Sequence, residues 1–150
     1  MSLFRGLKRY GKKIAIIDED LNNYTYDELL KSAKTIEKRI ARDATIFLIS
    51  NNSYEFVASY VGLIQSKVAL FLINKSINKE QLAYLINHYK PKYVLSPKKK
   101  GNIFVGLKEI FSLNNKFKLF ETKFDKKQKI YKNLALLMTT SGSTGSPKFV

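Results

Sequence analysis

A loop rich in hydroxyl and glycine residues, near the end of the chain, is the segment best suited to bind a ligand. It runs from Thr139 to Lys148 with the sequence TTSGSTGSPK. Gly142 and Gly145 allow backbone conformations that are closed to other residues, so successive N–H groups can turn toward one anion. The serine and threonine hydroxyls can add donors, and Lys148 adds a flexible positive charge. Phosphate oxygens are therefore the predicted ligand.

Two common phosphate-binding patterns do not occur in this loop. A Walker A loop requires Gly, four residues and then Gly-Lys-Ser/Thr, and a dinucleotide-binding loop requires Gly-x-Gly-x-x-Gly; the sequence contains neither. The alternative interpretation is a surface loop without a ligand, since Ser, Thr and Gly are common in such loops.

Few other residues are candidates for chemistry, because the chain has no cysteine and a single histidine. These counts exclude disulfides, thiolate metal sites, cysteine nucleophiles and multi-histidine metal sites. His88 is expected near a helix end in a structural role. Three further groups are expected to be structural or solvated: the acidic turn Asp18–Asp20, the aromatic residues Tyr54, Phe56 and Tyr60, and the lysines of Lys98–Lys100.

The elements that must position the loop alternate between strands and helices. Apolar runs predict strands at residues 14–18, 45–49, 68–73, 93–95 and 134–138, and paired strands at 110–113 and 117–120 around Asn114-Asn115. The runs at 45–49 and 68–73 have few polar interruptions, which indicates burial on both faces of a sheet. The last run leads directly into the glycine-rich loop.

Apolar residues at helical spacing predict a helix after each of the first strands. The first begins at Thr25 and has apolar residues at 26, 29, 30, 33, 36 and 40. Thr25 with Glu28, and Asn78 with Gln81, have the spacing of capping boxes. Pro91 requires the helix that follows Asn78 to end by Lys90. The alternation predicts an α/β fold of parallel-sheet βαβ units with flanking helices, without an internal domain boundary.

The charge of the chain suggests a second class of function. The formal net charge is +15, and residues 88–132 carry thirteen basic and three acidic side chains. Such a segment can bind nucleic acid or an anionic surface. However, 23 of the 27 basic residues are lysines, whereas specific nucleic-acid readout relies on arginine. Nucleic acid is therefore not the expected partner. No apolar run has the length of a membrane-spanning helix or a signal-peptide core, so we expect a cytoplasmic location.

The order of residues in the loop resembles the phosphate-binding signature of the adenylate-forming enzymes, the AMP-binding superfamily that includes acyl-CoA synthetases and peptide-synthetase adenylation domains. The strongest match is Thr140-Ser141-Gly142-Ser143-Thr144-Gly145-Ser146-Pro147-Lys148. Weaker similarity extends upstream to residues 13–18, 24–29, 46–51, 60–65, 68–73, 77–86 and 91–94. The family usually has glycine after the lysine, where this chain has Phe149.

The resemblance implies ATP-dependent activation of a carboxylic acid as an acyl-adenylate, with transfer to coenzyme A or to the phosphopantetheine of a carrier protein. It implies that Thr140, Ser141, Gly142, Ser143, Thr144 and Gly145 cradle the phosphates, that Lys148 stabilises their charge, and that Mg²⁺ accompanies ATP. Residues 1–150 would be the N-terminal part of the large AMP-binding domain, without the rest of that domain or the C-terminal domain. We expect this piece to be inactive alone, and a non-catalytic interaction fragment is the further alternative.

Overall fold

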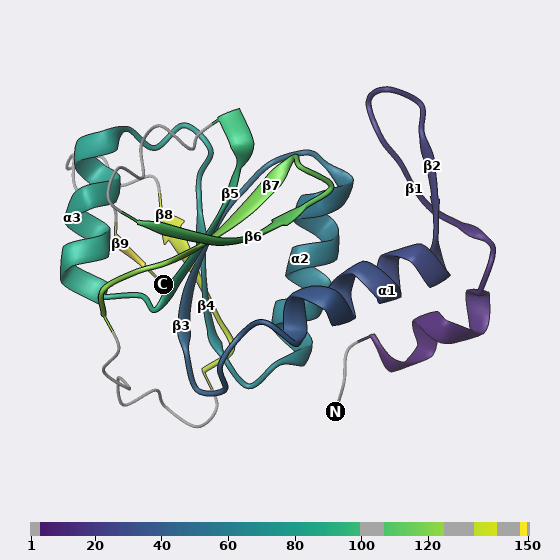
Figure 1. The fold of residues 1–150 in the computed structure, drawn as a ribbon, viewed down its shortest axis with the longest axis horizontal. Coiled ribbons are helices and arrows are strands. Elements are labelled where there is room, and N and C mark those ends of the chain that lie inside the picture. The colour runs from purple at the N-terminus through teal and green to yellow at the C-terminus, as the bar shows by residue number, and fades with distance from the viewer. Residues whose placement is uncertain (1–3, 100–106, 125–133, 141–147, 150) are drawn as a thin grey trace.

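A computed structural model describes residues 4–99, 107–124, 134–140 and 148–149 of the chain. For Arg5, Thr139, Thr140, Lys148 and Phe149 it describes the backbone only. The main sheet has seven strands in the order β6-β7-β5-β3-β4-β8-β9. Helices pack on both of its faces. Helices α1 and α2 cover one face and α3 covers the other (Figure 1).

The centre of the sheet is parallel, as the sequence predicts. Strand β3 (Thr45–Ile49) lies between β4 (Ala69–Ile73) and β5 (Tyr93–Pro97), and β8 (Leu136–Thr140) pairs with the other side of β4, all four strands being parallel. Every residue of β3 is buried. Ile46 and Leu48 face the core under α1 and α2, whereas Phe47 and Ile49 face the core under α3. This alternation explains the run without polar residues.

The helices begin where the capping residues predict. Helix α1 (Tyr26–Glu37) and helix α3 (Lys79–Tyr89) each start with a capping box, formed by Thr25 with Glu28 and by Asn78 with Gln81. Helix α2 (Tyr54–Gln65) is capped by Ser53, whose hydroxyl accepts a hydrogen bond from the Phe56 amide. Helix α3 ends before Pro91, with Lys90 in the left-handed conformation.

Two antiparallel additions extend the parallel centre. Strands β6 (Lys108–Leu113) and β7 (Phe117–Glu121) form the predicted hairpin, and β7 pairs with β5. Its turn residues Asn114 and Asn115 both have positive φ, 50° and 54°, a conformation that asparagine tolerates better than most residues. On the other side, the short strand β9 (Lys148–Phe149) pairs with β8.

The first predicted strand does not join the main sheet. Strand β1 (Ile14–Ile17) pairs only with β2 (Asn23–Thr25), in a separate two-stranded sheet that projects from the body after the short 3-10 helix η1 (Arg5–Tyr10) (Figure 1). Neither β2 nor η1 is predicted by the apolar pattern, because both elements are short. The other strand predictions are correct to within two residues at most ends.

Candidate functional site

The ends of the glycine-rich loop are held together by backbone pairing. Strand β8 ends at Thr140 and β9 begins at Lys148, and these two residues are register partners in the antiparallel β8–β9 pair. Because β8 is parallel to β4, its last residue lies at the same edge of the sheet as the carboxyl ends of β3, β4 and β5. The loop between Thr140 and Lys148 therefore starts and finishes at this carboxyl edge.

The loop residues themselves lie outside the described part of the chain. This applies to the predicted cradle residues Ser141, Gly142, Ser143, Thr144 and Gly145. For Thr140 and Lys148 the backbone is described, but not the side chain. The assignment of these seven residues to phosphate binding stays a prediction.

The carboxyl edge is also the place where the helical connections diverge. Helix α2 leaves β3 toward one face of the sheet, and α3 leaves β4 toward the other. In open α/β sheets such a switch point forms a crevice in which ligands bind. The two loops that flank it contact each other, because the Lys75 amide donates a hydrogen bond of 3.0 Å to the Ser50 hydroxyl.

A cavity of about 480 Å³ lies at this edge, over the ends of β3 and β5. Four of its described lining residues are lysines, and the acidic turn of the β1–β2 hairpin also lines it. The cationic residues are Lys75, Lys98, Lys99 and Lys116, and the acidic ones are Asp18, Glu19, Asp20 and Glu55. Lys98 and Lys99, which the sequence predicts to lie in a solvated turn, thus contribute to the wall of this cavity at the carboxyl edge of the sheet.

A buried carboxylate fixes one wall of this cavity. Glu55, in the first turn of α2, is only 2% exposed, and its Oε1 accepts a hydrogen bond of 3.0 Å from the Asn114 side-chain amide. The neighbouring Asn115 accepts a hydrogen bond of 3.2 Å from Lys98 Nζ. The β6–β7 turn is therefore tied to both α2 and the end of β5. Sequence reasoning misses this link, because an acidic residue in a first helical turn is ordinarily explained by the helix dipole.

The acidic turn is ordered by its own hydrogen bonds. Asp18 accepts hydrogen bonds from the Asp20 and Asn22 amides, from the Asn22 side chain and from the Tyr24 hydroxyl. Desolvation raises the pKa of Asp18, but the hydrogen bonds from Asn22, Tyr24 and Asp20 outweigh it and hold the pKa below its ordinary value. Desolvation and donation to Asp18 raise the pKa of Tyr24 to about 12. Among the described residues no group of three or more His, Asp or Glu side chains could hold a metal ion.

The remaining candidates of the sequence analysis have packing roles. His88 is exposed in the last turn of α3, with its ring stacked on Tyr84 at 5.7 Å and edge-on to Tyr89. Tyr54 is buried and stacks on Tyr24, with ring centroids 3.8 Å apart. Phe56 and Tyr60, partly buried on α2, lie against each other. The structural interpretation of these residues is consistent with their positions.

The parallel centre of the sheet and the helices on its two faces define an α/β protein, a class in which ligands usually bind at the carboxyl edge. A family model described as "AMP-binding enzyme" matches residues 3–150, and the chain belongs to this family. The resemblance identified from residues 140–148 is thereby confirmed.

Curated relatives come from two kinds of enzyme within the family. The chain is 26% identical over 143 residues to one of the plipastatin synthase proteins of Bacillus subtilis, covering 91% of this chain and 6% of that protein. It is 31% identical over 98 residues to 4-hydroxybutyrate–CoA ligase 2 of Metallosphaera sedula, covering 62% of this chain and 18% of that protein. The chain thus spans a small part of the length of the relatives it matches.

Solved structures share the fold. O-succinylbenzoate coenzyme A synthetase (MenE) from Bacillus subtilis, in complex with AMP, matches with a TM-score of 0.67 and 19% identity, over 96% of this chain and 40% of that one. ATP-bound MatB from Rhodopseudomonas palustris matches with a TM-score of 0.69 and 18% identity, over 95% of this chain and 33% of that one. Both matches support the α/β fold class predicted from the sequence. In the described part of the chain, no helix is both long and apolar enough to cross a membrane.

Proposed function

We propose that this chain is the phosphate-binding part of an ATP-dependent ligase that activates a carboxylic acid as an acyl-adenylate. In the first step, a carboxylate oxygen of the acid forms a bond to the α-phosphorus of ATP, and the bond from that phosphorus to pyrophosphate breaks. In the second step, a thiolate attacks the acyl carbonyl and AMP leaves. The thiol belongs to coenzyme A or to the phosphopantetheine of a carrier protein.

The observation that carries the proposal is the pairing of Thr140 with Lys148 at the carboxyl edge of the parallel sheet. A loop whose ends are pinned has less freedom to lose when it binds an anion. The pinned loop contains the glycines and hydroxyls of residues 141–147 and is followed directly by a lysine. Family membership supports the same assignment, and so does the AMP or ATP bound in the solved structures of relatives.

In this proposal, residues 140–145 donate hydrogen bonds to the β- and γ-phosphates, and Lys148 stabilises the negative charge that accumulates as pyrophosphate leaves. Mg²⁺ prefers phosphate and water oxygens and is commonly held through the substrate's phosphates. It would therefore enter with ATP, with no cluster of protein carboxylates required of this chain.

The carboxyl-edge cavity lies at the same edge of the sheet as the two ends of the phosphate loop, and it offers lysines as well as carboxylates to a ligand. Lys75, Lys98 and Lys116 come from different loops, and Glu55 fixes the turn that carries one of them. The acid-binding pocket, the remainder of the large domain and a C-terminal domain would be contributed by further chain, since residues 1–150 cover 40% of the MenE chain. A cytoplasmic location belongs to the same proposal.

Substitution of Lys148 by Ala in the full-length protein tests the proposal. We expect carboxylate-dependent exchange of pyrophosphate into ATP to fall by about 10²–10³, the usual loss when one preorganised charge-stabilising group is removed. The exposed Lys31 of α1 is the matched control, and Lys31→Ala should keep the activity of the parent.

The assignment of Lys148 is wrong if the Lys148→Ala protein keeps adenylation activity within about twofold of the parent. If instead the parent protein has no exchange activity with any carboxylic acid but binds nucleic acid with a steep salt dependence, the basic-protein alternative replaces the ligase.

A further inference from the structure

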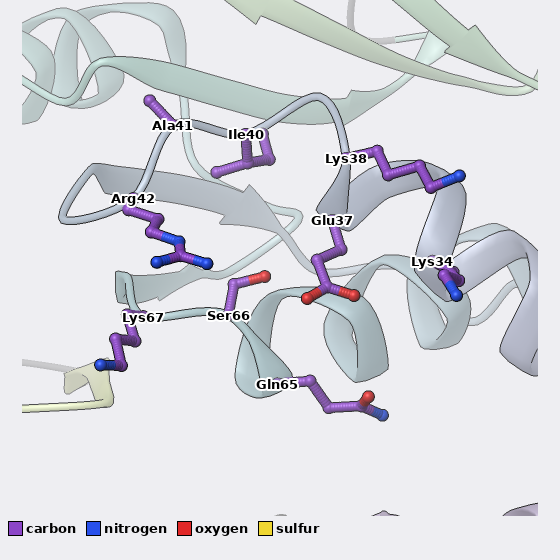
Figure 2. Close-up of a pocket in the computed structure, with 9 residues that line it drawn as sticks. All are labelled: Lys34, Glu37, Lys38, Ile40, Ala41, Arg42, Gln65, Ser66 and Lys67. Atoms are coloured by element: carbon purple, nitrogen blue, oxygen red, sulfur yellow. The ribbon is translucent and has the colours of Figure 1, made fainter.

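A second cavity lies at the opposite, amino edge of the sheet. It has a volume of about 490 Å³. Residues at the ends of α1 and α2 and in the loops before β3 and β4 line it (Figure 2). A volume of this size is typical of cavities that take small ligands. The parallel strands run from this edge to the carboxyl edge, so this cavity is separated from the predicted phosphate loop by the length of the sheet.

The charges around this amino-edge cavity are unbalanced. Two lysines, Lys34 and Lys38, reach it from the end of α1, and Arg42 and Lys67 reach it from the loops before β3 and β4. Among the described residues of the lining, Glu37 is the only acidic one. Within the described ranges, none of these five side chains makes an ion pair within 4.0 Å. All of them are exposed and can reorient toward a ligand.

The helix dipoles explain only part of this cluster. The carboxyl ends of α1 and α2 both lie at the cavity, and each carries a partial negative charge of about one half. Lys34 in the last turn of α1 and Lys38 at its C-cap suit that field. However, α2 has no basic residue in its last turn, and Arg42 and Lys67 lie outside both helices. The four positive charges therefore exceed the combined negative charge of Glu37 and the two helix ends by about two elementary charges.

The two loops that carry Arg42 and Lys67 are joined by a backbone hydrogen bond. The Asp43 amide donates a hydrogen bond of 2.7 Å to the Lys67 carbonyl, which joins the residue after Arg42 to Lys67. Asp43 has a positive φ of 59°, an uncommon conformation for a residue other than glycine. The backbones of the two loops are thus held together, and each carries a cation that lines the cavity. Like charges repel each other, and a bound anion removes that repulsion.

Side chains other than the cations also limit what can bind. Arg42 and Glu37 point toward Ser66 from opposite sides in Figure 2. The Ser66 hydroxyl donates to the Gly62 carbonyl at 2.9 Å, so its proton is not free for a ligand. The side-chain amide of Gln65 is an additional donor in the lining. The side-chain donors of the cavity are therefore almost all charged, and none of its described lining residues is aromatic.

From this geometry we propose that the amino-edge cavity binds a small oligoanion of the phosphate type, in a site separate from the phosphate loop. The guanidinium of Arg42 can hold one phosphate group through two parallel hydrogen bonds, and the lysines act as mobile point charges on its neighbours. A free oligophosphate and the phosphate chain of a nucleotide share this chemistry. The lining favours the free oligophosphate, because none of its described residues offers an aromatic ring on which a base could stack.

Titration with tripolyphosphate tests the site, with the predicted phosphate loop disabled by Lys148→Ala. Calorimetry gives the affinity, and amide chemical shifts locate the anion. We expect binding at an ionic strength of about 0.01 M that weakens at about 0.15 M, with the largest shifts at the amides of Arg42, Ser66 and Lys67. ATP should bind no more tightly than tripolyphosphate.

Three variants in the same background distinguish binding at this cavity from non-specific attraction by the net positive charge of the protein. Arg42→Gln with Lys67→Gln should weaken binding by at least about tenfold, because each cation faces several anionic charges. Lys79→Gln with Lys90→Gln removes the same charge at the ends of α3 and should change affinity by less than about twofold. Glu37→Gln should strengthen binding, which a variant with a damaged fold would not do.

Equal losses in the two double variants, or shifts spread over the whole surface, would overturn the site. So would a failure to bind tripolyphosphate up to millimolar concentration. Tighter binding of a single-stranded DNA oligonucleotide than of tripolyphosphate would replace it by a nucleic-acid surface. None of these results depends on adenylation activity, so the site and the ligase proposal can fail separately.

Discussion

The two helices on one face of the sheet approach each other tightly at Gly62 of α2. A Cβ atom at this position would lie 2.4 Å from the carbonyl oxygen of Ala33 in α1, 3.0 Å from its carbonyl carbon and 3.2 Å from its Cα. Carbon–oxygen contacts in packed interiors are about 3.4 Å or longer, so Gly62→Ala must push the helices apart by about 1 Å. The obstacle is backbone and cannot rotate away.

The expected stability change is a difference between two opposing effects. Overpacking of a well-packed core costs about 1–3 kcal/mol, and alanine in a helix is favoured over glycine by about 0.5–1 kcal/mol. Since the clash is with backbone, we expect Gly62→Ala to lower the free energy of unfolding by about 1–2 kcal/mol. For a chain of this size this corresponds to a melting temperature lower by about 2–8 °C.

Urea unfolding of the purified chain measures this change, and Gly6→Ala is the matched control. A Cβ at Gly6 meets nothing within 4 Å, so this variant should stay within about 0.5 kcal/mol of the parent. If Gly62→Ala is as stable as Gly6→Ala, the helices are not in close contact at this point.

Two further outcomes follow from the hairpin and from the last long strand. The folded-state pKa of Tyr24 is about 12, above its ordinary value of 10.0, so the neutral phenol stabilises the fold below pH 10 and this contribution disappears as the pH rises from 10 to 12. Tyr24→Phe should therefore make unfolding free energy fall less steeply over that range, and equal slopes in both proteins would contradict the assignment. In β8, Met138 is 52% exposed, whereas β3 is fully buried; amide hydrogen exchange at Leu136–Met138 should be at least about tenfold faster than at Ile46–Ile49. Equal protection of the two strands would show that β8 is as firmly held as β3.

The sequence predicts well those elements whose determining residues lie close together along the chain. Thr25 with Glu28 and Asn78 with Gln81 form capping boxes because both partners lie within one helical turn. The run Thr45–Ile49, in which Thr45 is the one polar residue, predicts a strand covered on both faces, since polar residues on either face would have to enter a core. The order of residues 140–148 is specific enough to predict the family.

Features that depend on residues far apart in the chain are not predictable in this way. Glu55 and Asn114 meet because β7 pairs with β5 and brings its turn over α2, and no local pattern encodes that pairing. Strand β1 has an apolar pattern similar to that of the sheet strands, yet it pairs only with β2. The cluster of Arg42 and Lys67 likewise arises from the approach of two loops that 24 residues separate. For the predicted site itself, the structure places the two ends of the loop and leaves the roles of its residues as predictions.

The order of strands in the sheet also bears on the order of events during folding. Strands β3, β4 and β5 are consecutive and are joined by single helices, so their pairing needs only short loop closures. Strand β8 pairs with β4 through Leu70 and Leu136, and a much longer stretch of chain must be ordered or looped out first. Until β8 pairs with β4, the backbone groups of Leu70, Phe71 and Leu72 in β4 form an unpaired edge of the sheet. Intermediates that lack β8 should therefore be the species that aggregate, and slower synthesis or lower temperature should raise the yield of soluble protein.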